Sequence, residues 1–160
     1  MPVSSTAGAT IHIGGKLAVQ SDDVDVADFS GVTWTEIKEV EGLGSVGDTA
    51  QEITFDSITS RRTRRLKGTR SAGTMEIVCG LDYADAGQIA AIAAEKTDDN
   101  YAFKVTFDDA PTGGTPSERY FVAMVGAVTE QFDGANNVTK LNISLWVNSN
   151  IARVAAAEAA

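Results

Sequence analysis

Residues 119–148 read RYFVAMVGAVTEQFDGANNVTKLNISLWVN, and this stretch indicates the fold class. Apolar and polar residues alternate from 138 to 148, which predicts a strand with one buried face. Residues 119–132 carry apolar side chains on both faces, as in a long strand that is central or covered on both sides. A hairpin signal separates the two at 133–137. The inward residues of the second strand are Leu141, Ile143, Leu145 and Val147.

The rest of the chain adds shorter strands and one helix. Asp85 is the predicted N-cap, and Gln88 three residues later completes a capping box. The Ala- and Ile-rich run that follows predicts a helix over 85–97. Its apolar side is one narrow stripe, so we expect the helix to lie on a sheet. That stripe comprises Ile89, Ile92, Ala93 and Lys96. Further strands are predicted over residues 10–20, 33–40, 51–58, 73–81 and 101–107.

The composition agrees with a mainly β protein. The chain has 160 residues, enough for one domain with a sizeable core. Val and Ile total 25 against 6 Leu, an excess that favours strands over a helix bundle. No apolar run is long enough to cross a bilayer and residues 1–6 do not resemble a signal peptide, so we expect no membrane partner and assembly in a cytoplasm.

Charge is distributed unevenly along the chain. The net charge is −9, which disfavours nucleic-acid binding through an overall positive surface. Residues 61–70 nevertheless carry 6 of the 13 basic side chains and no acidic one. The remaining 150 residues therefore carry a net charge of −15. The bases are Arg61, Arg62, Arg64, Arg65, Lys67 and Arg70.

Several motifs that could indicate chemistry lack the context they require. Residues 42–47 match G-x-G-x-x-G, but no helix is predicted after them, so we interpret them as a flexible turn. The acidic cluster at 22–28 fails the spacing of a Ca²⁺ loop. His12 has no catalytic partner motif, and Cys79 alternates with apolar residues as a buried side chain does. We predict no catalytic residue, no metal site and no cofactor.

The basic run has three possible interpretations. It has little apolar content, so residues 59–71 are predicted to form an exposed loop. Such a loop could bind phosphates, but it contains no aromatic residue for base stacking. It could instead contact the acidic surface of another copy, which would build rings or open polymers. The third possibility is a solvated loop without a partner.

A family resemblance favours the second interpretation. The stretch from Phe29 to Gly44, FSGVTWTEIKEVEGLG, resembles the N-terminal part of the tail tube proteins of long-tailed bacteriophages. The run from Arg64 to Glu76, RRLKGTRSAGTME, looks like the arginine-rich loop and following strand of that family. The order of the later elements is also similar, so the resemblance covers about residues 28–150. Ser71 stands where we would expect an acid, which departs from the family pattern.

The resemblance implies a fold and a set of partners. It implies a β-sandwich or barrel-like tail-tube domain at 10–150 with one flanking helix, a long inter-subunit loop at 45–73 and arms at 1–9 and 151–160. Copies would form six-fold rings stacking into the hollow tail tube of a virion, assembled in the host cytoplasm. Tape-measure, tail terminator and distal tail proteins would be further partners, and genome DNA would pass through without specific binding. Tubes of related phage-derived particles or secretion systems are alternatives, as is a nucleic-acid-binding module.

An acidic lumen would repel the phosphates of DNA that passes through such a tube. We therefore predict that acidic residues on strand faces line it. The candidates are Glu36, Glu39 and Glu41.

Overall fold

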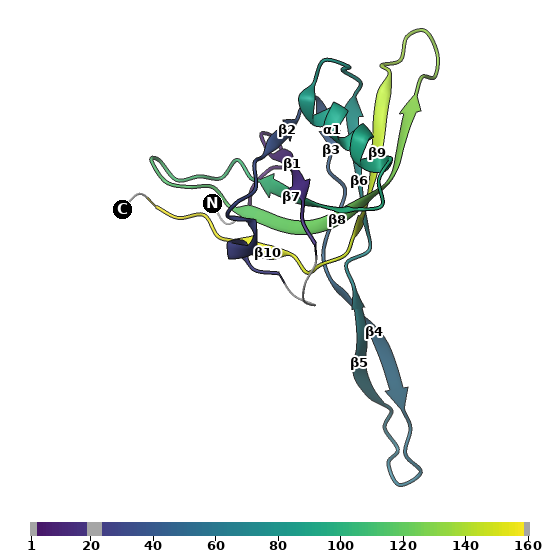
Figure 1. Cartoon of the computed structure of the whole chain (residues 1–160). Coiled ribbons are helices and arrows are strands. Elements are labelled where there is room, and N and C mark those ends of the chain that lie inside the picture. Colours follow the sequence, from purple (N-terminus) through teal and green to yellow (C-terminus); the bar gives the residue numbers. More distant parts are fainter. Residues whose placement is uncertain (1–2, 19–23, 159–160) are drawn as a thin grey trace.

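The computed structural model describes residues 3–18 and 24–158, and its architecture is mainly β (Figure 1). An antiparallel sheet of eight strands has the order β2-β1-β7-β8-β9-β6-β3, with β10 pairing beside β8, and β4 and β5 form a second sheet. No helix among the described residues is long and apolar enough to span a membrane. The strands are β1 (Thr10–Lys16), β2 (Thr35–Ile37), β3 (Val40–Gly42), β4 (Thr49–Phe55), β5 (Arg64–Ser71), β6 (Thr74–Gly80), β7 (Asn100–Thr106), β8 (Glu118–Gln131), β9 (Lys140–Val147) and β10 (Ala152–Val154); the helices are η1 (Val26–Phe29) and α1 (Ala86–Glu95).

The large sheet curls into an open barrel (Figure 1). Its two edge strands, β2 and β3, do not pair with each other but are joined by only two residues. β2 ends at Ile37 and β3 begins at Val40, so Lys38 and Glu39 connect the two edges. Glu39 adopts a positive φ of 60° at this connection, and its carbonyl accepts a 2.7 Å hydrogen bond from the N–H of Gly80 on β6. The single strand expected at 33–40 is therefore divided, because the chain turns at Lys38 and Glu39 from one edge of the barrel to the other.

α1 secures this closure through one buried side chain. Gln88, 1% exposed, donates from Nε2 to the carbonyls of Lys38 at 3.1 Å and Gly80 at 2.9 Å. Its Oε1 accepts a hydrogen bond from the N–H of Asp82 at 3.0 Å. Asp85 caps the helix by accepting from the N–H of Gln88, and also accepts from that of Lys38. The N-cap prediction is thus confirmed, whereas Gln88 bonds to the barrel instead of completing a capping box.

The buried face of α1 differs from the predicted stripe. Ala91 and Ala94 are buried, whereas Ile89 is 51% exposed and Ala93 and Lys96 are exposed. Small residues face the barrel because the helix approaches the sheet closely: a Cβ on Gly87 would overlap the backbone of Glu36 and Ile37. The stripe prediction was correct for Ile92, which is partly buried against the core, and wrong for the other three residues. Close contact between the helix and the sheet sets which face is buried, and hydrophobicity alone does not reveal it.

The core fills the inside of the curled sheet. Its fully buried residues alternate along the strands as predicted, and Phe103 and Phe121 stack with ring centroids 5.7 Å apart. A smaller cluster covers the outer face of β7 and β8, where Val122 and Ala102 pack with Phe29 of η1. β8 is therefore apolar on both faces because both are covered. The inner residues of the later strands include Met75, Ile77, Cys79, Leu141, Ile143, Leu145 and Val147.

The structure tests the expectations for the C-terminal arm but not those for every predicted segment. Residues 1–2 and the acidic residues Asp22 and Asp23 lie outside the described part of the chain. The segment expected to be a C-terminal arm at 151–160 contributes β10, which pairs with Glu118–Tyr120 of β8. Residues 152–154 therefore belong to the large sheet.

Candidate assembly interface

The basic segment belongs to a β-hairpin that projects from the barrel. β4 and β5 pair only with each other in the sheet topology, and Figure 1 shows them extending away from the body, opposite α1. The segment expected to be an exposed loop at 59–71 thus contains the strand Arg64–Ser71. The sequence did not indicate this strand because most of its side chains are polar or charged. Backbone pairing with β4 holds it, and no buried apolar face is needed.

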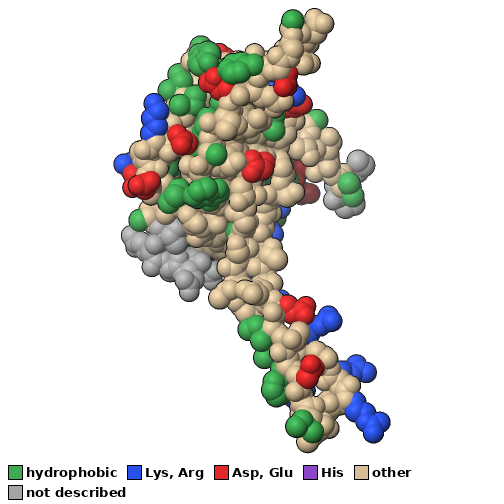
Figure 2. Space-filling model, turned by 90° about the vertical axis from the view of Figure 1, so that its right-hand side faces the viewer, with side chains coloured by type: hydrophobic (Ala, Val, Ile, Leu, Met, Phe, Trp, Pro, Cys, Tyr) green, Lys and Arg blue, Asp and Glu red, His purple; other side chains and the backbone are tan. Residues whose placement is uncertain are grey.

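The pairing register separates the side chains of the hairpin into two faces. Ile53 lies opposite Leu66, and Phe55 lies opposite Arg64, so these residues share one face. Glu52 lies opposite Lys67 and Thr54 opposite Arg65 on the other face. Figure 2 shows hydrophobic side chains along one side of the projection and Lys and Arg along the other.

The apolar face is open to solvent. Ile53, Phe55 and Leu66 are 49%, 56% and 62% exposed, and Ile58 at the tip is fully exposed. A two-stranded hairpin alone is marginally stable in water, and large apolar side chains gathered on one face indicate an interaction surface. The sequence predicted a strand over 51–58 but did not reveal that its apolar residues lie exposed on one face of a hairpin. Leu66 could join them only once the register was known.

All six bases of the predicted contact set lie on this hairpin. Arg61 and Arg62 precede β5, and the other four lie within it. The side chain of Arg65 is 74% exposed, and its Nε lies 3.7 Å from Oε1 of Glu52. Residues 49–71 contain six bases and two acids, for a net charge of +4 on the projection. The hairpin therefore presents an apolar face, which also carries Arg64, and a basic face with Arg65 and Lys67.

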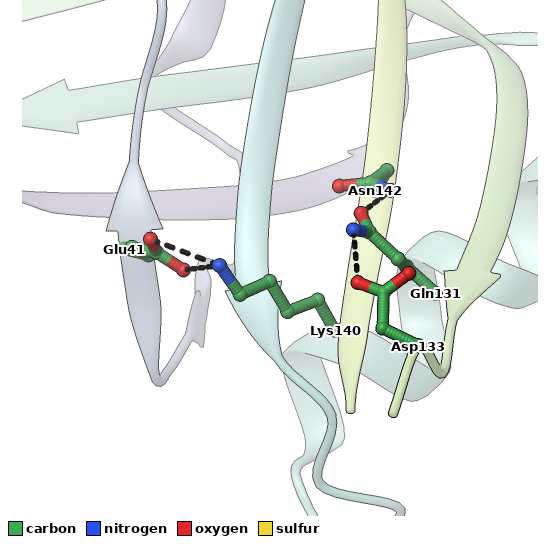
Figure 3. A network of polar contacts seen from close by, with 5 residues as sticks. All are labelled: Glu41, Gln131, Asp133, Lys140 and Asn142. Carbon is green, nitrogen blue, oxygen red and sulfur yellow. Dashed lines mark hydrogen bonds and ion pairs between the residues drawn. The ribbon is translucent and has the colours of Figure 1, made fainter. Parts of the chain in front are cut away.

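The three predicted lumen acids lie together at the closure of the barrel. Glu36 is half-buried on β2, and Glu39 is exposed in the connection to β3. Glu41 on β3 forms an ion pair with Lys140 of β9, with Oε2 2.8 Å from Nζ (Figure 3). Figure 3 also shows Gln131, which donates to Asp133 and accepts from Asn142 near the turn between β8 and β9.

We expect Glu41→Gln to change the free energy of unfolding by no more than about 0.5 kcal/mol. The Glu41 side chain is 58% exposed, and exposed ion pairs contribute little because water and salt screen them. Urea unfolding at low and high salt measures this change. A loss of several kcal/mol would show that the pair holds β3 in place.

The described residues contain no arrangement of side chains that indicates catalysis or metal binding. They hold no cluster of three or more His, Cys, Asp or Glu side chains able to bind a metal. Burial raises the pKa of the Cys79 thiol to about 11, which leaves it protonated at neutral pH. Burial lowers the pKa of His12, whose Nδ1 has no hydrogen-bond partner.

Comparison with known proteins relates this geometry to a fold. No protein-family model matches the chain, and no curated protein matches it. Solved structures do match: the SPP1 tail tube is 16% identical with a TM-score of 0.62, over 92% of this chain and 76% of that one. The chain has the tail-tube fold.

Two further structures with this fold come from other assemblies. The sheath/tube terminator of PVC, an extracellular contractile injection system, is 9% identical with a TM-score of 0.69, over 96% of this chain and 97% of that one. A tail of a gene transfer agent particle, resolved with C6 symmetry, is 14% identical with a TM-score of 0.62. The match covers 96% of this chain and 100% of that one. The mainly β tail-tube-like architecture expected from the sequence is therefore confirmed.

Proposed function

We propose that the protein is a structural subunit of a phage-like tail, the repeating unit of a hollow tube. The projecting hairpin carries the proposal, because it exposes an apolar face that nothing in residues 3–18 and 24–158 covers. The SPP1 tail tube and a gene transfer agent tail with C6 symmetry contain chains with this fold. This likeness supports stacked six-fold rings for the present chain. The tube would belong to a virion assembled in a host cytoplasm, with tape-measure, terminator and distal tail proteins as partners.

The hairpin supplies two kinds of contact to a neighbouring copy. Burial of Ile53 and Leu66 against a neighbour would stabilise association by removing apolar surface from water. The bases beside them would select an acidic surface and set the register of the contact. The body of the chain is acidic, so a second copy can offer that surface. Such a contact joins two different patches and can repeat without closing.

Reversing two hairpin charges tests this function. We expect Arg64→Glu with Arg65→Glu to abolish tubes and rings in negative-stain electron microscopy and to leave the circular dichroism spectrum unchanged. The matched control, Arg64→Lys with Arg65→Lys, keeps the charge and should assemble. Normal tubes from the reversed variant would refute the role of the hairpin. A wild-type protein that stays monomeric at high concentration would refute the tube function.

DNA would pass through the tube without binding to it. The net charge of −9 opposes retention of phosphates, and Glu36, Glu39 and Glu41 remain our proposed lumen residues. Replacing all three by Gln should leave assembly intact and slow DNA release from complete particles.

The tail-tube fold also allows a different position in the assembly. A terminator caps one end, as the matching PVC protein does, and would form single rings but no tubes. The tube of a contractile injection system is a further alternative, since the sheath-tube complex of PVC also contains a matching chain. Electron microscopy of the purified protein separates the cap from the repeating subunit.

The basic face of the hairpin supports one function of another class. Six bases on an exposed projection could neutralise phosphates of nucleic acid. This alternative predicts that the folded monomer slows the migration of DNA in a gel at low salt. The retardation should disappear as the salt concentration rises. Absence of retardation at low salt would exclude it.

A further inference from the structure

The end of the barrel opposite the hairpin also exposes large apolar side chains. Tyr83 and Ile89 are 67% and 51% exposed, the first just before α1 and the second on it. Phe132 and Val138, in the connection between β8 and β9, are 59% and 66% exposed. Figure 1 shows α1 and this connection at the end of the body remote from β4 and β5.

These two segments are linked and acidic. The hydroxyl of Tyr83 donates to the carboxylate of Glu130 at 3.3 Å, which joins the segment before α1 to the end of β8. Residues 81–96 and 129–140 together contain five acids and two bases, a net charge of −3. One of the bases, Lys140, is already paired with Glu41. We call residues 81–96 and 129–140 the acidic end.

The hairpin and the acidic end match each other in both properties. The hairpin combines four exposed apolar side chains with a net charge of +4. The acidic end combines four exposed apolar side chains with a net charge of −3. Among the described residues, these eight are most of the eleven large exposed hydrophobic side chains. Opposite charge steers two surfaces together, and apolar area supplies affinity once water is removed.

We propose that the acidic end is the docking surface for the hairpin of a second copy. The inference rests on the proposed function, since it requires copies that associate, and it adds which surface receives the hairpin. Because the two surfaces lie at opposite ends of one chain, each copy receives a hairpin at one end and offers its own at the other. This heterologous contact makes the assembly polar and repeatable, which a symmetric pairing of hairpins would not do.

Photo-crosslinking locates the surface that receives the hairpin. A photoreactive phenylalanine analogue replaces Ile58, which is fully exposed at the hairpin tip, and the protein is assembled and irradiated. Mixing ¹⁵N-labelled and unlabelled copies identifies crosslinks between chains by mass spectrometry. We expect inter-chain crosslinks in 81–96 or 129–140. Crosslinks confined to other segments would overturn the docking surface while the tube function stands, and absence of any assembly would overturn both.

A charge exchange provides the second test. Glu130→Lys with Phe132→Ser should lower the sedimenting assembled fraction at least about tenfold, because both the charge and apolar contributions are lost. The control, Glu130→Asp with Phe132→Leu, keeps both properties and should assemble. Mixing the first variant with Arg64→Glu, Arg65→Glu protein should produce mixed oligomers. Normal assembly of the first variant would refute the docking surface.

Discussion

A protein carrying Ile53→Ser and Leu66→Ser is expected to fold normally and to fail to assemble. The two side chains lie opposite each other on the apolar face of the hairpin and are 49% and 62% exposed. Because they are exposed in the single chain, we expect the free energy of unfolding to change by about 0.5 kcal/mol or less. Burial in an interface is worth about 1.5 kcal/mol for each, so the contact should weaken by about 3 kcal/mol.

A loss of about 3 kcal/mol per contact lowers the association constant roughly 100-fold. Light scattering against protein concentration measures the shift in the concentration at which assembly begins. The matched control is Thr54→Ser on the opposite face of the same hairpin, paired with Arg65. Unchanged assembly of the double variant would show that the charges alone form the contact.

The second large effect concerns the closure of the barrel. We expect Gln88→Leu to lower the free energy of unfolding by about 3 kcal/mol. Leucine fills a similar volume but leaves the carbonyls of Lys38 and Gly80 and the N–H of Asp82 without this partner, in partly buried surroundings. Each buried polar group left unpaired costs about 1–3 kcal/mol. The loss exceeds that of a single hydrogen bond because one side chain serves three backbone groups.

Thermal unfolding measures this change as a fall in Tm of about 10 °C. The neighbouring substitution Ile89→Gln is the control, since Ile89 is 51% exposed on the same helix and should hardly change Tm. An unchanged Tm for Gln88→Leu would mean that the strands hold the closure without α1. Assembly should fail together with folding in this variant, whereas the hairpin variant loses assembly alone.

The interface shows why the sequence revealed only part of the candidate site. The bases were identified because six of them in ten residues stand out in an acidic chain. The apolar face was missed because Ile53 and Leu66 are separated by twelve residues, several of them charged. Strand register brings them together, and register depends on which backbone groups pair across the hairpin. Exposed charged strands lack the alternation that indicates a strand in sequence.

The strands of the barrel were determined by the sequence itself. Alternation along 73–81 and 138–148, together with apolar residues on both faces of 119–132, predicted β6, β9 and β8, because burial of one or both faces leaves a period of two or a continuous apolar run. Asp85 likewise determined the start of α1, because capping is a local interaction.

Only the tertiary structure decided how these elements meet. It placed the small residues of α1 against the barrel, turned the chain at Glu39 and used Gln88 to join β6 to the connection between β2 and β3. It also placed a basic hairpin and an acidic end at opposite ends of one body. Each depends on contacts between residues distant in the chain, which local pattern does not encode.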